Sequence, residues 1–146
     1  MARDPIPMWC FALVLVKRGH RFLLVHERKH EQGWYLPAGR VEAGESFVDA
    51  AVRETKEEAG VDIAIEGILQ VQHNPAGRRM RIFFLARQID DAPPKSAPDE
   101  HTLEARYFGV DELAGLVLRG DEVEHWMRHA LATTPAPLSF LVDVIA

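Results

Sequence analysis

The chain has 146 residues and a formal net charge of −5, with 47% apolar and 27% charged residues. This length and composition are typical of one globular domain with a single core, so we expect residues 1–146 to form one domain. The net negative charge excludes strong nonspecific attraction to nucleic acid or to an anionic membrane. An anionic substrate would therefore depend on a metal ion or on a few well-placed cationic side chains.

Cysteine usage and the N-terminal residues bear on the compartment. Cys10 is the only cysteine, so the chain can form no internal disulfide and a reducing compartment is expected. The N-terminal residues MARDPIPM lack the basic-then-apolar layout of a signal peptide. No apolar run approaches the roughly 20 residues that a membrane span needs. We therefore expect a cytoplasmic protein whose partners include neither nucleic acid nor a membrane.

Short apolar runs alternate with polar turns along the chain. They predict strands at residues 8–16, 21–27, 61–74, 79–87 and 105–110. Residues 34–45, which contain Pro37, Gly39 and Gly44, predict an extended loop, as does the proline-rich segment 88–101. Helical patterns follow at 110–120, with Asp111 as the cap, and at 121–131, whereas residues 133–146 carry no clear pattern. Strands before, between and after helices indicate an α/β fold with a mixed sheet that helices cover.

The clearest helix begins after Ser46, whose hydroxyl can cap it, with Asp49 three residues later. Gly60 suits the left-handed residue that ends such a helix. One face carries small or apolar side chains at helical spacing, and we expect this stripe to be buried. Its members are Val48, Ala51, Val52, Thr55 and Ala59.

Three glutamates, Glu54, Glu57 and Glu58, lie within five consecutive positions of this helix. Spacings of three and four residues place their carboxylates on one helix face, where each like-charge pair costs about 0.2–0.5 kcal/mol. A divalent cation would turn this repulsion into attraction, and Mg²⁺ prefers such oxygen ligands. A solvated acidic face balanced by Arg53 and Lys56 is the alternative.

The loop before the helix favours the metal site over the solvated face. In PAGRVEAGE, Gly39 and Gly44 allow the backbone to approach a ligand or metal ion without obstruction by a side chain. A glycine loop that leads into an acidic helix is the layout expected of a site for a metal ion and a diphosphate.

Residues 39–61 resemble the Nudix box, G-x5-E-x7-R-E-U-x-E-E-x-G-U, in which U is a bulky aliphatic residue. Gly39, Glu45 and the run RETKEEAGV from Arg53 match the fixed letters at the correct spacing. Thr55 is the one departure, and because it faces the buried stripe we expect a change in packing and not in chemistry. The resemblance implies a Nudix-type α/β/α sandwich, with a mixed β-sheet between helices.

The resemblance also implies hydrolysis of a nucleoside diphosphate that is linked to a further group. Glu54, Glu57 and Glu58 would hold Mg²⁺ or Mn²⁺, and Glu54 is the first choice to polarise the attacking water. The carbonyl of Ala38 would be a further ligand, and Glu104 or Glu100 could supply one from outside the box. Arg53 and Glu45 are expected to brace the loop against the helix, with Gly39 and Gly60 as structural box residues.

Phosphate groups need cations, and a base needs aromatic or apolar contacts. The cationic candidates are Arg28, Lys29, Arg78, Arg79 and Arg81, and the aromatic candidates are Trp34, Tyr35, Phe11 and Phe83, of which Phe11 and Phe83 also suit the core. His125 and His129 lie four residues apart, but the glutamate arrangement of zinc proteases is missing, so a metal site is not expected there.

The substrate is less well defined by the sequence. GWYLPAGRVEAGE and the downstream FFLAR are similar to the enzymes that hydrolyse oxidised guanine nucleotides, 8-oxo-dGDP in particular, with triphosphates such as 8-oxo-dGTP as a neighbouring choice. Pro75 lies close to the position at which ADP-ribose hydrolases carry a proline, so ADP-ribose or a nucleotide sugar is an alternative. A catalytically inactive Nudix domain that senses a ligand is a further alternative, although such a domain would be expected to lose a helix glutamate. The sequence allows a homodimer and does not decide it.

Overall fold

Two long strands form the centre of the fold in the computed structural model, which describes residues 2–144. β1 (Trp9–Arg18) and β6 (Arg79–Gln88) run parallel to each other, and their register pairs Leu13 with Phe83 and Val16 with Ala86. Both strands contain uninterrupted apolar runs, because helices cover both faces of the sheet.

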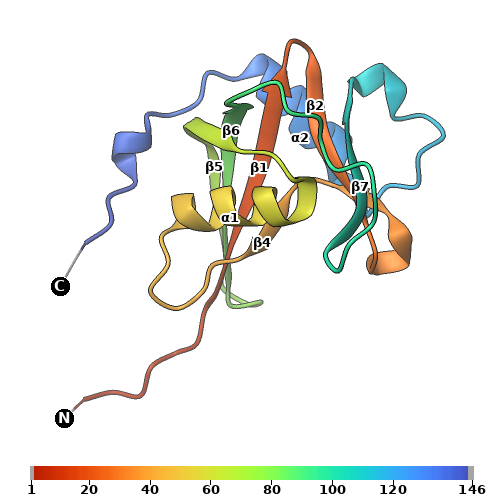
Figure 1. Ribbon diagram of the computed structural model, residues 1–146. Helices are drawn as coiled ribbons and strands as arrows, with labels where there is room; N and C mark the ends of the chain where they lie inside the picture. The colour runs from red at the N-terminus through yellow and green to blue at the C-terminus, as the bar shows by residue number, and fades with distance from the viewer. Residues whose placement is uncertain (1, 145–146) are drawn as a thin grey trace.

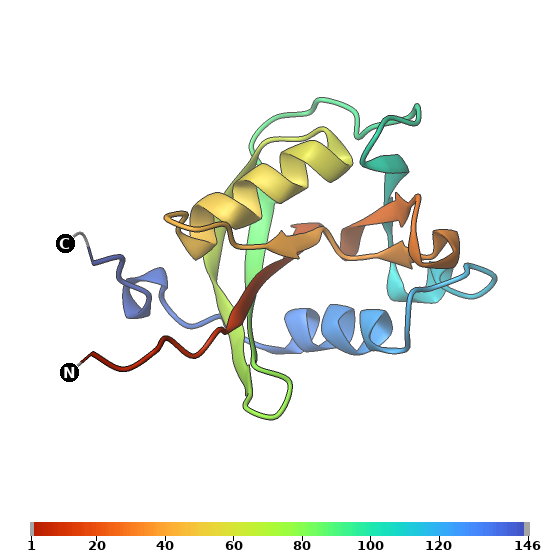
Figure 2. The same ribbon diagram turned by 90° about the horizontal axis from the view of Figure 1, so that it is seen from below.

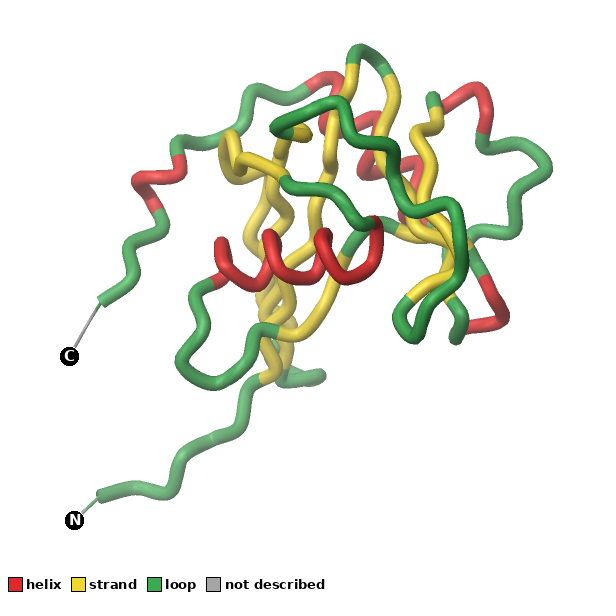
Figure 3. Tube along the Cα trace, in the orientation of Figure 1, coloured by secondary structure: helices red, strands yellow, loops and turns green. Residues whose placement is uncertain are grey.

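The remaining strands surround this pair. They are β2 (Arg21–Glu27), β3 (Trp34–Tyr35), β4 (Ala38–Arg40), β5 (Ile63–Asn74) and β7 (Thr102–Phe108). The strand order is β3-β2-β1-β6-β5, with β4 paired to β1 and β7 paired to β2. All pairs except that of β1 with β6 are antiparallel, so the sheet is mixed. Figure 3 shows the strands in yellow between the two α-helices in red.

Helices α1 (Phe47–Ala59) and α2 (Glu122–Ala132) lie on opposite faces of the sheet, as Figure 2 shows. Side chains of successive strand residues point to opposite faces. On β1, Ala12 and Val14 therefore pack in the core layer that α1 covers, and Leu13 and Leu15 pack in the layer that α2 covers. The expected sandwich, a mixed β-sheet between helices, is confirmed.

The layer beneath α2 contains the largest buried side chains. Trp126 of α2 is 2% exposed and stacks on Phe83 of β6, with 3.7 Å between the ring centroids. Stacked aromatic pairs contribute about 0.5–1.5 kcal/mol beyond the area that they bury. Phe83 is thus a core residue, and it does not contact any cavity that could hold a base.

The prediction of a helix at residues 110–120 is wrong. Only the 3₁₀ turn η2 (Val110–Glu112) forms there, and Gly115 and Gly120 adopt positive φ angles of 88° and 73°. The chain instead runs back along β3, where Leu118 forms a parallel bridge with Trp34. Positive φ at two glycines and pairing with a strand are incompatible with a helix.

The prediction of an extended loop at residues 34–45 is partly wrong, because β3 and β4 lie within this segment. The backbone of β4 pairs with β1 through Phe11–Arg40 and Leu13–Ala38. The remaining expected strands and helices form, with ends that differ by a few residues. Two further 3₁₀ turns, η1 (His30–Gln32) and η3 (Leu138–Phe140), occupy loops.

Figure 1 shows both ends of the chain leaving the body on one side of the molecule. Near the C-terminus, Ala136 pairs with Ile68 of β5, with hydrogen bonds of 2.9 and 2.7 Å in the two directions. Among residues 2–144, no helix combines the length and the apolar character that crossing a bilayer demands.

We expect Trp126→Ala to lower the free energy of unfolding by about 3–5 kcal/mol, because the substitution removes the ring stacked on Phe83 and leaves a cavity. Equilibrium urea unfolding measures this change. Leu131→Ala on the same helix is the control, since Leu131 is 39% exposed. Equal losses in the two variants would contradict the assignment of Trp126 to the core.

Candidate active site

The acidic helix and the glycine loop meet where β4 passes beside α1. The helix begins at Ser46, whose Oγ accepts a hydrogen bond of 3.0 Å from the backbone N–H of Asp49. It ends at Gly60, which has the left-handed φ of 73°. These two caps define where the helix begins and where it ends.

Gly39 of β4 lies directly against the carboxylate of Glu54. A Cβ atom at position 39 would lie 2.0 Å from the Glu54 Cδ atom, well inside van der Waals contact. In addition, the backbone N–H of Ala38 donates a hydrogen bond of 2.9 Å to Oε1 of Glu58. The loop and the helix therefore form one unit, in which a side chain at position 39 would displace the Glu54 carboxylate.

Arg53 links the carboxylates that surround this contact. Its Nε and Nη2 donate to the two oxygens of Glu45 at 2.7 and 2.9 Å, a two-pronged bond. Its Nη1 donates to Glu54 at 2.9 Å and to Glu57 at 3.3 Å, and Nη2 also reaches the carbonyl of Arg40 at 3.1 Å. One guanidinium thus joins the loop to the acidic face of the helix.

The electrostatics of the carboxylates follow from burial and from Arg53. Burial raises the pKa of Glu58 well above its usual value, against the opposing hydrogen bond from Ala38. Burial also raises the pKa of Glu54, and the hydrogen bond from Arg53 counteracts it. The hydrogen bond from Arg53 lowers the pKa of Glu45. Glu58 is therefore the carboxylate whose negative charge is least compensated within the protein.

The C-terminal end of α1 is anchored by the proline-rich loop. Nζ of Lys95 donates to the carbonyl of Glu57 at 2.7 Å, and Oγ1 of Thr102 donates to the carbonyl of Glu58. Asp99 pairs with Lys95 at 2.6 Å, and this hydrogen bond lowers the pKa of Asp99 to about 2. A cation and a hydroxyl thus satisfy carbonyls that every helix C-terminus leaves free, at the turn that carries the glutamates.

Two cavities adjoin this unit. The first has a volume of about 260 Å³ and contains most of the charged groups; its lining is Glu27, Arg28, Lys29, His30, Ala38, Glu54, Glu58, Glu100, His101 and Arg119. The second has a volume of about 290 Å³ and has an apolar wall; its lining is Phe11, Leu13, His30, Tyr35, Ala38, Gly39, Arg79, Arg81 and Arg119. His30, Ala38 and Arg119 line both cavities, so the two are neighbours.

The structure brings several of the sequence-predicted residues to these cavities and leaves others away from them. Arg28 and Glu100 line the first cavity, and Arg79 lines the second. Glu104 lines neither and forms an ion pair of 2.8 Å with Arg106 on the same strand. Glu57 also lies outside both linings and pairs with Arg53 instead.

The aromatic candidates divide in the same way. Trp34 is 7% exposed and stacks on His26 at 4.6 Å within the core, so it does not line either cavity. Tyr35 and Phe11 line the second cavity. Trp34 and Tyr35 both belong to the core layer that α2 covers, but only Tyr35 also lines a cavity.

Arg81 lines the second cavity, but the protein itself uses its donors. Its Nε and Nη2 donate to Oε1 of Gln72 at 3.0 and 2.6 Å, and its Nη1 donates to Glu122 at 3.1 Å. Tyr35 also donates its hydroxyl proton to Glu122. Burial acts to raise the pKa of Glu122, but the bonds from Arg81 and Tyr35 outweigh burial and lower it. This network forms a rigid polar wall of the second cavity.

Glu27 and Arg119 were missed by the sequence analysis. Glu27 is 8% exposed, and Nη1 of Arg119 donates to its two oxygens at 3.1 and 3.2 Å. A charged residue at the end of the strand RFLLVHE is a weak signal of function. Arg119 follows an irregular segment that the sequence had predicted as a helix, so no sequence signal placed it at this site.

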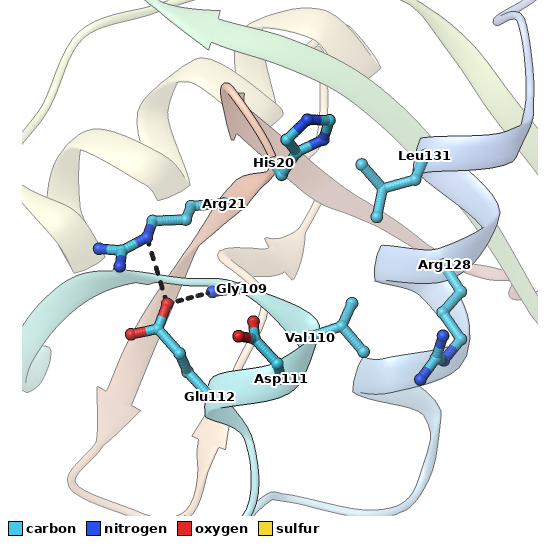
Figure 4. A pocket seen from close by; sticks show the side chains of 8 residues that line it. All are labelled: His20, Arg21, Gly109, Val110, Asp111, Glu112, Arg128 and Leu131. Carbon is cyan, nitrogen blue, oxygen red and sulfur yellow. Dashed lines mark hydrogen bonds and ion pairs between the residues drawn. The ribbon is translucent and has the colours of Figure 1, made fainter.

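A cavity of about 630 Å³ lies elsewhere, between η2 and α2, and Figure 4 shows the residues around it. Among its charged groups, Glu112 pairs with Nε of Arg21 at 3.2 Å and accepts a hydrogen bond of 2.9 Å from the backbone N–H of Gly109. No residue of α1 lines it. The acidic helix therefore defines the candidate active site, and this larger hollow does not.

The donor chemistry near Gly39 suits a hard divalent cation, since carboxylate and carbonyl oxygens are the ligands that Mg²⁺ prefers. Within residues 2–144, no three His, Cys, Asp or Glu side chains converge closely enough to hold a metal ion as they stand. Arg53 supplies part of the positive charge that these glutamates need. The residues fit a dication by chemistry and charge. Glu58 is desolvated and has a backbone N–H as its hydrogen-bond partner, so a dication would stabilise its negative charge.

Comparison with known proteins agrees with this geometry. A model of the NUDIX domain matches residues 8–132. The chain belongs to the NUDIX family, and the resemblance seen in the sequence is thereby confirmed. A solved NUDIX hydrolase from Nitrosomonas europaea superposes with a TM-score of 0.80 at 23% identity, over 94% of this chain and 98% of that chain. At this identity the likeness shows the fold.

Curated relatives share more of the sequence. The human protein named 8-oxo-dGDP phosphatase NUDT18 is 43% identical over 115 residues, which are 77% of this chain and 35% of that protein. The Danio rerio protein of the same name is 35% identical over 128 residues, which are 82% of this chain and 38% of that protein. The chain therefore spans little more than a third of the length of these relatives.

Gly39→Ala should weaken binding of Mn²⁺ to the metal-free protein by about 10-fold or more, because the new methyl group would displace the Glu54 carboxylate. The electron paramagnetic resonance signal of free Mn²⁺ measures this affinity. Gly19→Ala is the control for the loss of a glycine, since a Cβ atom at position 19, where φ is 60°, would meet no atom within 4 Å. Wild-type affinity in Gly39→Ala would show that the Glu54 carboxylate takes no part in metal binding.

Glu58→Gln should raise the melting temperature of the metal-free protein at pH 7, since it removes a buried charge and keeps an oxygen for the Ala38 N–H. Each 1 kcal/mol gained corresponds to about 2–4 °C in a chain of this size. The pKa of Glu58 is raised on folding, so the stability cost of ionising it grows as the pH rises from the unfolded-state pKa of about 4.3 toward the folded-state pKa, and the gain should disappear below about pH 4.

Differential scanning calorimetry over this pH range measures the effect, with exposed Glu66→Gln as the control variant. A lower melting temperature for Glu58→Gln at pH 7 would instead assign the Glu58 charge a structural role.

Proposed function

We propose that the chain is a pyrophosphohydrolase that uses Mg²⁺ or Mn²⁺ to cleave the diphosphate of a nucleoside diphosphate derivative. The observation that carries this proposal is the contact between Gly39 and Glu54, which places buried carboxylates of α1 at a cavity that adjoins a second, more apolar one. A charged compartment beside an apolar compartment suits a nucleotide, which has an anionic and an aromatic half.

Glu54, Glu57 and Glu58, with the carbonyl of Ala38, are the groups that would hold the metal ions. When bound, the ions would neutralise the diphosphate oxygens and lower the pKa of the attacking water. Glu54 is the residue that we propose to accept the proton of that water, because its carboxylate lies against Gly39 where the two cavities meet. Arg53 and Glu45 hold the loop and the helix together during the reaction.

The reaction that follows from these roles is a simple displacement. A water oxygen forms a bond to one phosphorus, and the bridging P–O bond breaks. The water proton passes to Glu54, and the leaving phosphoryl group carries away the bridging oxygen. In-line attack requires that the reacting atoms be held in position, which is what a rigid helix and a glycine contact provide.

An oxidised purine nucleotide, 8-oxo-dGDP or 8-oxo-dGTP, is the first choice of substrate. The names of the NUDT18 relatives support this choice, at 43% and 35% identity. The second cavity supports it too, because Phe11 offers an aromatic face and the Arg81–Glu122–Tyr35 network offers fixed polar groups for the edge of a base. ADP-ribose and nucleotide sugars are the competing substrates, and an inactive domain is the competing function.

A substrate panel tests the proposal. Purified protein is given 8-oxo-dGDP, 8-oxo-dGTP, dGTP, ADP-ribose and a nucleotide sugar, with Mg²⁺ or with EDTA, and phosphate or nucleotide release is measured. We expect the fastest release from the oxidised nucleotides and none with EDTA. Faster release from ADP-ribose would make ADP-ribose the proposed substrate in place of the oxidised nucleotides. If no compound is hydrolysed, a ligand-sensing domain is favoured.

Glu57→Gln should reduce turnover by at least about 100-fold, since the amide no longer offers the negative charge that a metal ion needs. The far-ultraviolet circular dichroism spectrum should be unchanged, because Glu57 is partly exposed on the helix surface. Glu124→Gln on α2 is the matched control, with a side chain that is 52% exposed. Wild-type turnover in Glu57→Gln would remove this residue from the metal site.

A further inference from the structure

Arg119 stands between the charged cavity and the apolar cavity and lines both of them. Of the other candidate arginines, Arg28 lines the first cavity, Arg79 and Arg81 line the second, and Arg78 lines neither. A nucleotide that placed its base in one cavity and its outer phosphate in the other would pass over Arg119. A guanidinium at this boundary is therefore the best-placed cation for the group that joins the two halves.

The donor edge of Arg119 is also free to bind an anion. Nη1 is held by both oxygens of Glu27, whereas Nε and Nη2 donate no hydrogen bond to any residue between 2 and 144. Its side chain is 40% exposed and lines both cavities. Arg81 differs, because all three of its guanidinium nitrogens are bound to Gln72 or Glu122. Two parallel N–H groups are the pattern that binds phosphate oxygens in a fork.

The backbone holds Arg119 in this position. Its N–H donates a hydrogen bond of 2.9 Å to the carbonyl of Trp34, and the Trp34 N–H donates one of 2.8 Å to the carbonyl of Val117. A Cβ atom on Gly33 would lie 2.8 Å from the Arg119 backbone nitrogen, so the segment is packed closely against β3. The guanidinium lies over the Tyr35 ring at 4.8 Å. A cation that is oriented in advance loses little freedom on binding.

We propose that Arg119 is the diphosphate-binding residue of this site, with Glu27 holding one side of its guanidinium while Nε and Nη2 bind phosphoryl oxygens. This inference rests on the proposed function, because it assumes a nucleotide that spans both cavities. It adds a residue outside the sequence motif, supplied by an irregular segment far along the chain. The occupant is a nucleoside diphosphate, and the contact is made by the diphosphate and not by the base.

The test is the affinity for a nonhydrolysable α,β-methylene nucleoside diphosphate in the presence of Mg²⁺, measured by isothermal titration calorimetry. Arg119→Met should raise Kd by about 10- to 100-fold, the range for loss of a hydrogen bond between charged groups. Arg119→Lys should recover only part of the affinity, since Lys lacks the fork. Arg128→Met is the matched control and should bind as the wild type does, because Arg128 lies on α2, 65% exposed and outside both cavities.

Arg119→Met also leaves Glu27 buried without its partner, which could weaken binding indirectly. Glu27→Gln distinguishes this indirect effect from the loss of a direct contact between Arg119 and the diphosphate. If Arg119 contacts the diphosphate, Glu27→Gln should weaken binding much less than Arg119→Met does. Equal losses in both variants, or wild-type affinity in Arg119→Met, would overturn the assignment while the proposed function stands. Failure of the wild type to bind the analogue would overturn the proposed function and this inference together.

Discussion

The contact between the Gly39 backbone and the Glu54 carboxylate is the constraint on which the candidate site depends. It brings a strand edge so close to the Glu54 side chain that a Cβ atom at position 39 would displace the carboxylate. The same approach lets the Ala38 N–H reach Glu58, so two adjacent residues of β4 meet two glutamates one turn apart. Together, the two contacts join β4 to the acidic face of α1.

Such close packing concentrates negative charge, and the protein balances that charge in an uneven way. Arg53 pairs with Glu45, Glu54 and Glu57, which stabilises the loop and the exposed part of the acidic face. Glu58 receives only a backbone N–H and has a raised pKa because it is buried. A buried carboxylate without a cationic partner costs stability, so a site of this kind is arranged for a ligand and not for maximal stability.

Segments without regular structure complete the site. The proline-rich loop anchors the last turn of α1 through Lys95 and brings Glu100 and His101 to the charged cavity. The segment before α2 is paired to β3 and brings Arg119 to the boundary between the two cavities. Regular elements thus fix the carboxylates, and the loops supply further polar groups that line the two cavities.

The sequence by itself determined the elements whose signals are local. The spacing of Gly39, Glu45 and the three glutamates identified the helix, its caps and the family, because these residues lie within one short stretch. Apolar runs identified the central strands for the same reason. The tertiary structure alone decided that Trp34 is buried in the core, that Glu104 lines neither cavity, and that Arg119 reaches the site. Those outcomes depend on pairing between segments distant along the chain, and local patterns do not encode such pairing.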